Sequence, residues 1–171
     1  MRLWRKLAVA LFLAAGAGCG RAHDLQEGVY VFTIPAEGIL RDDCGLADAG
    51  PQMQAEFTDF GDDIRLAVVQ QTSSACLALE LVGQYQLNNQ SFFADGTASN
   101  PPLSANGQTC QVSFVQFHLD GATIDSATFS GVMRISYLAS SPVTCNCQFW
   151  FNFQAALCTP PDCPPVPTEC S

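Results

Sequence analysis

Cysteine is the residue type with the widest range of chemistry in this chain, since a thiol can form a disulfide, bind a metal or carry a lipid. The 171 residues include nine cysteines, a number that argues against a reducing cytosol. One of them, Cys19, lies near the N-terminus, apart from the others. The remaining eight are candidates for four disulfides: Cys44, Cys76, Cys110, Cys145, Cys147, Cys158, Cys163 and Cys170.

The spacing of Cys145 and Cys147 bears on how the cysteines pair. Two residues apart on a strand, they point the same way with Cα atoms roughly 7 Å apart, which is the limit that a disulfide spans. We therefore expect a separate partner for each. The alternative is a zinc site formed with the cysteines of residues 158–171, but the two C-x(2–4)-C motifs that such sites usually combine do not both occur. Disulfides are the expectation, with no metal.

Histidine is the next candidate for chemistry. His118 has Asp120 and Asp125 nearby, and a His–Asp pair can serve as a general base with its orienting group. A serine or cysteine in a nucleophile context does not accompany it, so we interpret His118 as a surface residue beside a hairpin. Neither a phosphate-binding glycine loop nor a hydrolase motif occurs. The sequence therefore predicts no catalytic residue, no cofactor and no enzyme.

Aspartates gather in two places, and both could be read as oxygen-rich calcium loops. The groups are Asp42, Asp43 and Asp48, followed by Asp59, Asp62 and Asp63. Neither has the residue order of an EF-hand. Because aspartate is favoured in turns, we expect solvated turn residues and no bound metal.

The first eighteen residues have the organisation of an export signal. Arg2, Arg5 and Lys6 precede an uncharged apolar run over residues 7–18. A basic region followed by an apolar region of this length is typical of a secretory signal, and it is too short to span a bilayer, which needs about 20 residues. Residues 1–18 are therefore predicted to be a signal peptide.

The end of this segment, Gly16-Ala17-Gly18-Cys19, resembles the lipobox at which bacterial lipoprotein signal peptides are cut before a lipid-modified cysteine. The resemblance implies lipidation of Cys19, attachment to the membrane and, from Gly20, the outer membrane as destination. The alternative is an ordinary cut after Ala17. Parity favours lipidation, because it leaves eight cysteines for four bridges. Residues 19–27 would then be a tether.

The charge of the mature chain limits its partners. After residue 18 there are four arginines, no lysine and sixteen acidic residues, a formal net charge of −12. Such a surface repels nucleic acid and anionic headgroups, so we expect no nucleic-acid partner and a body that stands off the bilayer. The sequence leaves open which protein or small molecule is the partner.

Residues 28–157 alternate between apolar and polar side chains, which predicts antiparallel strands. Gly61-Asp62 and Asp120-Gly121 are suited to two-residue hairpin turns, the second placing Leu119 opposite Ala122. Residues 95–109 read as a loop. The apolar parity switches between Phe114 and Val115, so we also predict a β-bulge in residues 115–124.

The last strand, predicted over residues 144–154, alternates most regularly. Its apolar face would pack against the strand before it, with Met133 near Phe149 and Phe129 near Phe153. Eight or nine short strands without a crossover helix predict an all-β fold, either a barrel or a sandwich of about eight strands held by disulfides. Since tight hairpins join most strands, we expect an antiparallel up-and-down barrel.

The C-terminal residues 158–171 combine five prolines with three cysteines, a composition that excludes a ladder strand. Three cysteines cannot all pair among themselves, so an odd number of bridges must join this segment to the body. We therefore predict a strap across the domain, which would also cover the outward-facing Trp150.

The start of the body, Gly28-Val29-Tyr30, is similar to the G-x-W motif in the first strand of lipocalin-like barrels. That resemblance implies a carrier with an internal cavity for a small apolar ligand. Our first expectation remains a non-enzymatic, membrane-anchored lipoprotein of the cell envelope, whose β domain binds a partner or has a structural role. A barrel interior filled by Phe114, Phe129, Met133, Phe149 and Phe151 would leave no room for cargo.

Overall fold

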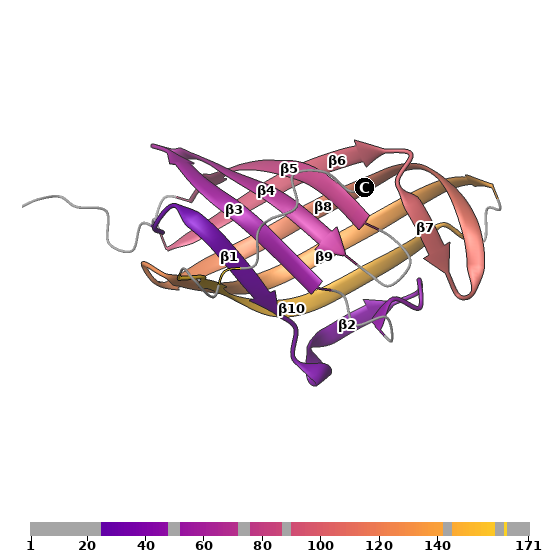
Figure 1. Cartoon of the computed structure of the whole chain (residues 1–171), viewed down its shortest axis with the longest axis horizontal. Coiled ribbons are helices and arrows are strands. Elements are labelled where there is room, and N and C mark those ends of the chain that lie inside the picture. The colour runs from indigo at the N-terminus through magenta and orange to yellow at the C-terminus, as the bar shows by residue number, and fades with distance from the viewer. Residues whose placement is uncertain are drawn as a thin grey trace, which may run out of the picture.

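A computed structural model describes residues 25–47, 52–71, 76–86, 90–141, 145–159 and 163. The described chain is all-β, with one short 3-10 helix (Figure 1). Its elements are β1 (Gly28–Thr33), η1 (Ala36–Gly38), β2 (Ile39–Asp42), β3 (Gln52–Phe60), β4 (Asp63–Gln71), β5 (Cys76–Tyr85), β6 (Ser91–Ser99), β7 (Pro102–Ala105), β8 (Gln108–Asp125), β9 (Thr128–Ser141) and β10 (Cys147–Leu157).

The strands form one closed antiparallel barrel, which confirms the predicted fold class and decides between barrel and sandwich. Eight strands follow one another around it in the order β1, β3, β4, β5, β6, β8, β9 and β10. The sheet closes where β1 pairs with β10, from Tyr30 opposite Leu157 to Thr33 opposite Gln154. Every barrel strand therefore neighbours the next one in sequence, as in an up-and-down barrel.

The two extra strands are continuations of barrel strands. After the break that contains η1, the chain of β1 returns as β2 to pair with the N-terminal part of β10, around Phe149. In the same way β7 continues β6 along the edge of β8, in the same register and beyond a break at Asn100 and Pro101. Both extensions lie toward the same end of the barrel.

The predicted hairpin at Asp120-Gly121 is wrong, because β8 runs straight through it to Asp125. Leu119 pairs with Met133 of β9, and the turn lies at residues 126–127. Gly121 is needed for packing: a Cβ at this position would collide with the ring of Phe92 inside the barrel. The glycine at position 121 therefore makes room for the Phe92 ring and does not mark a turn.

The predicted loop over residues 95–109 is also wrong, since it contains most of β6, all of β7 and a hairpin. Asn106 and Gly107 form the two-residue turn between β7 and β8, with Ala105 paired to Gln108. Their φ angles are 50° and 75°, and a turn with positive φ at both central residues is type I′, for which Asn-Gly is preferred. The Gly61 turn, with φ 88°, lies where it was predicted.

The inward-facing positions of β8 do change parity, but the main bulge lies earlier in the chain than the sequence predicted. The register shifts between Val112 and Phe114, so that Phe114 points outward and is 40% exposed, while Val115 is buried. A second shift, from Thr123 to Asp125, adjoins the turn. Phe114 is therefore not part of the interior, contrary to expectation.

The register between the last two strands differs from the prediction by two residues. Met133 lies opposite Phe151, and Phe129 lies opposite Ala155. The shift is a whole period of the strand, so the same side chains still point inward and the apolar face of β10 is as predicted.

The barrel interior is filled by aromatic rings that surround Phe129. The centroid of this ring lies 5.2 Å from that of Tyr30, 5.6 Å from Phe32, 5.4 Å from Phe92 and 5.7 Å from Phe153. Contacts in this range are favourable beyond the area that they bury. Further along the barrel the largest fully buried side chains include Phe117, Phe149, Phe151, Leu66, Leu81 and Leu119.

Truncating the central ring should be far more costly than truncating the outward one. We expect Phe129→Ala to lower the free energy of unfolding by about 3–5 kcal/mol, because it leaves a cavity among four rings. Phe114→Ala, on the outside, should cost less than about 1 kcal/mol. Urea denaturation of both variants under oxidising conditions measures the difference; equal losses would contradict the filled interior.

Candidate functional site

Three disulfides are present in the described chain. They join Cys44 to Cys147, Cys110 to Cys145, and Cys158 to Cys163, with Cα–Cα distances of 5.2, 5.8 and 5.3 Å. Cys145 and Cys147 thus have separate partners, as their spacing predicted. Bridges of this kind persist in an oxidising compartment outside the cytoplasm, which is where the domain belongs.

Two of these bridges fasten the end of the barrel that carries β7. The Cys44–Cys147 bridge holds the loop after β2, and the tip of the β7–β8 hairpin lies on this loop. The backbone N–H of Asn106 donates to the carbonyl of Cys44 at 3.0 Å, and its side-chain amide donates to the carbonyl of Asp43 at 3.0 Å. Sequence reasoning missed this clasp, because it placed Asn106 in a structureless loop.

The third bridge lies within the C-terminal segment, between Cys158 and Cys163. Cys19 and Cys170 are outside the described residues, as is the side chain of Cys76. The predicted lipidation, the strap and its cover over Trp150 therefore fall outside the described part of the chain and stay predictions.

The opposite end of the barrel is closed by the segment before β1. Leu25 is 3% exposed, and its N–H donates to the hydroxyl of Tyr85 at 3.3 Å. The hydroxyl of Tyr30 donates to the carbonyl of Gln26 at 2.9 Å. Burial raises the pKa of Tyr30, and the neighbouring Tyr85 and Asp125 add to the effect. Tyr30 therefore has a structural role, as a protonated hydroxyl that ties the segment before β1 to the barrel.

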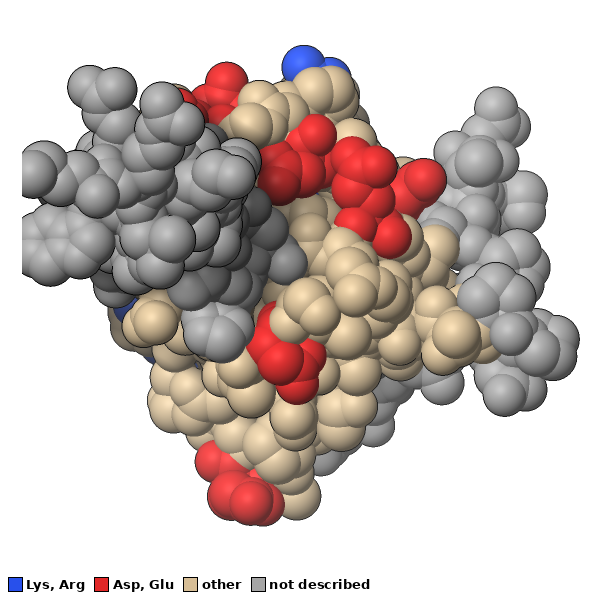
Figure 2. All heavy atoms as spheres, turned by 90° about the vertical axis from the view of Figure 1, so that its left-hand side faces the viewer, with Lys and Arg blue, Asp and Glu red and all other residues tan. Residues whose placement is uncertain are grey.

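Carboxylates gather over this closed end, as Figure 2 shows. They come from the segment before β1 and from the turns at this end: Glu27, Asp59, Asp62, Asp63 and Asp125. Asp59 accepts a hydrogen bond from the N–H of Gly61 at 2.7 Å, and Asp125 from that of Ala127 at 2.8 Å. Asp42, at the other end, accepts from Leu46 and Ala47. These aspartates hold turns, which is the role expected for them, while Asp48 lies outside the described residues.

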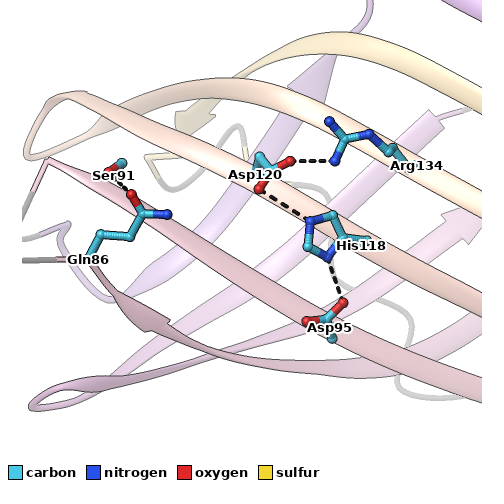
Figure 3. A network of polar contacts seen from close by, with 6 residues as sticks. All are labelled: Gln86, Ser91, Asp95, His118, Asp120 and Arg134. Atoms are coloured by element: carbon cyan, nitrogen blue, oxygen red, sulfur yellow. Dashed lines mark hydrogen bonds and ion pairs between the residues drawn. The ribbon is translucent and has the colours of Figure 1, made fainter.

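His118 belongs to a polar network on the outer face of β6, β8 and β9 (Figure 3). Its Nδ1 lies 2.7 Å from Oδ1 of Asp95, and its Nε2 lies 3.2 Å from Oδ1 of Asp120. The other oxygen of Asp120 accepts a hydrogen bond from Arg134. We call these four residues the His118 network. Asp120 was predicted nearby, whereas Asp95 was missed because it arrives from a different strand.

The geometry of the His118 network bears on what it can do. Both ring nitrogens lie within hydrogen-bond distance of carboxylate oxygens, one from β6 and one from β8 itself. Asp125, the other predicted neighbour, instead holds the turn after β8. The arrangement is suited to tying three strands together on the surface.

The cations of the described chain lie in a single row around the outside of the barrel. Arg65 pairs across strands with Val82, and beyond the His118 network Arg134 pairs with Trp150. Trp150 pairs in turn with Arg41, whose guanidinium lies 5.2 Å from the Trp150 ring centroid. Each arginine also has a carboxylate within reach, so the row is locally neutral.

Neither a protein-family model, nor a curated protein, nor a solved structure matches this chain. Its class is therefore defined by the geometry alone: a closed, eight-stranded, antiparallel up-and-down β-barrel with two short additional strands and disulfides at one end. Among the described residues no group of three histidine, cysteine or acidic side chains could hold a metal.

The three bridges should differ in their effect on stability. The Cys44–Cys147 bridge spans a sequence separation of 103 and Cys158–Cys163 a separation of only 5. Because a longer loop loses more freedom when it is closed, the double Cys→Ala variant of the first pair should lose about 4–5 kcal/mol, and that of the second about 2 kcal/mol. Guanidinium unfolding of both variants gives the comparison, and a larger loss for the short loop would refute it.

Proposed function

We propose that this is a non-enzymatic lipoprotein, anchored to the membrane at Cys19, whose β-barrel acts through its outer surface. The observation that carries the proposal is the filled interior: the four rings that surround Phe129 occupy the space in which a carrier would hold its cargo. What the barrel offers to a partner is therefore its exterior and its two ends.

Several features support anchoring at the N-terminus. The basic and apolar segment before Cys19 has the form of an export signal, and the disulfides fit an oxidising destination. In the part of the chain that the structure describes, no helix is long and apolar enough to cross a membrane. In this proposal attachment comes from acyl chains, of which two already give stable binding.

The point at which the tether meets the barrel sets the expected orientation. Five residues lie between Cys19 and Leu25, and the six Cα–Cα steps that join the two positions reach at most about 22 Å. The closed end, with its carboxylates around Glu27 and Asp125, would then face the bilayer. Anionic headgroups would repel it, which favours a body standing off the membrane with the clasped end outward.

The absence of catalysis is part of the same proposal. The only histidine in the described chain, His118, has both nitrogens occupied by Asp95 and Asp120. It is also partly exposed on a convex outer face, where a substrate could not be sheltered from water.

A lipocalin-like carrier of a small apolar ligand is the second candidate. The closed up-and-down barrel favours it, and so does the place of Tyr30, buried at the start of β1 where that family has a tryptophan. A carrier purified from its membrane should release a stoichiometric apolar compound on solvent extraction. The filled interior predicts that none is released.

Intact-mass measurement of the protein purified from membranes tests the first proposal. We expect a chain that begins at Cys19 with three acyl groups, lowered by about 8 Da for four bridges. Cys19→Ser should move the protein from the membrane to the soluble fraction, while Cys76→Ser, as a control, should leave it on the membrane. A wild-type chain beginning at Gly18 without lipid would overturn the anchor.

A further inference from the structure

A groove of about 470 Å³ lies on the outer face of the barrel, where β8, β9, β10 and β2 run side by side. This volume is within the range of small-molecule sites. The groove is separate from the His118 network and adjoins the clasped end, from which Asp43 and Cys147 contribute to its lining. Residues of its lining include Arg41, Asp43, Phe114, Gln116, Ser136 and Gln148.

The groove exists because a short side chain, that of Ser136, lies between longer side chains on the outer face. Gln116 pairs with Ser136, and Ser136 with Gln148, so these three form one line across β8, β9 and β10. The small Ser136 is the middle member of this line. On the side toward the clasped end stand Phe114 and Leu138, 40% and 45% exposed, of which Phe114 faces outward only because of the bulge after Val112.

The groove is bordered by a polar atom for which the described residues supply no partner. The side-chain Oε1 of Gln148 is buried, and among the described residues nothing hydrogen-bonds to it. Leaving such an acceptor unmet is unfavourable, and a ligand donor could meet it if the Gln148 amide turns toward the groove. The buried Nε1 of Trp150, two residues along the same face of β10, likewise has no described partner.

Charge and backbone pairing limit what could bind there. Arg41 and Asp43 are joined at 2.6 Å, so the two charged residues of the lining neutralise each other and the groove favours neither an anion nor a cation. Around the groove β8, β9 and β10 are hydrogen-bonded on both sides. Among the four strands at the groove a peptide could therefore be added only along the outer edge of β2, which is four residues long.

We propose that the groove binds a neutral saccharide. Sugar hydroxyls can donate to Gln148 and both donate to and accept from Gln116 and Ser136, while the apolar face of a sugar ring packs against Phe114 and Leu138. The inference rests on the proposed function in one respect: it takes the exterior of the barrel as the surface that acts.

Trp150 provides a built-in reporter for the test. The chain has two tryptophans, and Trp4 lies in the predicted signal peptide, so Trp150 is the only tryptophan of the mature protein. The protein, purified from whichever fraction contains it, with any detergent free of a sugar headgroup, is titrated with maltohexaose, cellohexaose, laminarihexaose and chitohexaose. We expect a saturable change in Trp150 fluorescence with at least one of them. The result does not depend on the state of Cys19, so it can fail or succeed independently of the lipid anchor.

Two variants and two matched controls locate the binding. Gln148→Leu removes the acceptor and should weaken binding about tenfold, the equivalent of one hydrogen bond. Ser136→Phe fills the groove and should abolish it. Gln54→Leu removes another buried, unpartnered Oε1, on β3, and Ser130→Phe places the same ring elsewhere on the outer face of β9. Both controls should bind as the wild type does.

Three results would overturn the proposal. The first is no response to any of the four oligosaccharides. The second is unchanged binding by Ser136→Phe. The third is a response only to polygalacturonate or to a neutral decapeptide, which would assign the groove to an anion or to a peptide instead.

Discussion

The structure depends on the pairing of its first barrel strand with its last. Four residue pairs join β1 to β10, and the N–H of Cys158 adds a hydrogen bond at 2.8 Å to the carbonyl of Val29. This seam turns a meander into a barrel, because it pairs the free edges of the first and the last barrel strand with each other. Without it the aromatic cluster around Phe129 would lie open on one side, since Tyr30 and Phe32 enter the cluster from β1.

Closure also divides the surface of the molecule into three regions, namely the two ends of the barrel and its outer face. One end is shut by Leu25 and carries carboxylates, and the other is clasped by two disulfides and by Asn106. Between them the outer face has a row of arginines in ion pairs and a groove whose two charged residues, Arg41 and Asp43, neutralise each other. A chain with a formal net charge of −9 thus keeps each of its described arginines in a local ion pair.

The sequence was sufficient for the properties that alternation and parity determine. Strand alternation predicted an all-β barrel and the inward face of β10, and the two-residue spacing of Cys145 and Cys147 predicted separate partners. The prediction failed where one local pattern can have two physical causes. Asp120-Gly121 has the composition of a turn, but Gly121 is required because Phe92 packs on it. The actual type I′ turn, at Asn106 and Gly107, lies in a stretch rich in prolines and polar residues that predicted a loop.

The candidate sites were harder to predict because they are assembled across strands. Asp95 meets His118 only through the pairing of β6 with β8, and β6 lay in a segment that was read as a loop. The groove likewise depends on register: the bulge after Val112 places Phe114 outside, and cross-strand pairing puts Ser136 between two glutamines. A single-strand pattern contains neither piece of information.

Amide hydrogen exchange in β1 and β10 tests the central claim, that the sheet is closed, most directly. The account predicts that the amides of Val31, Gln154 and Ala156, which face this seam, are protected as strongly as those in the middle of β8 and β9. Rapid exchange along this seam, with protection retained in β8 and β9, would mean an open sheet and would contradict the filled barrel.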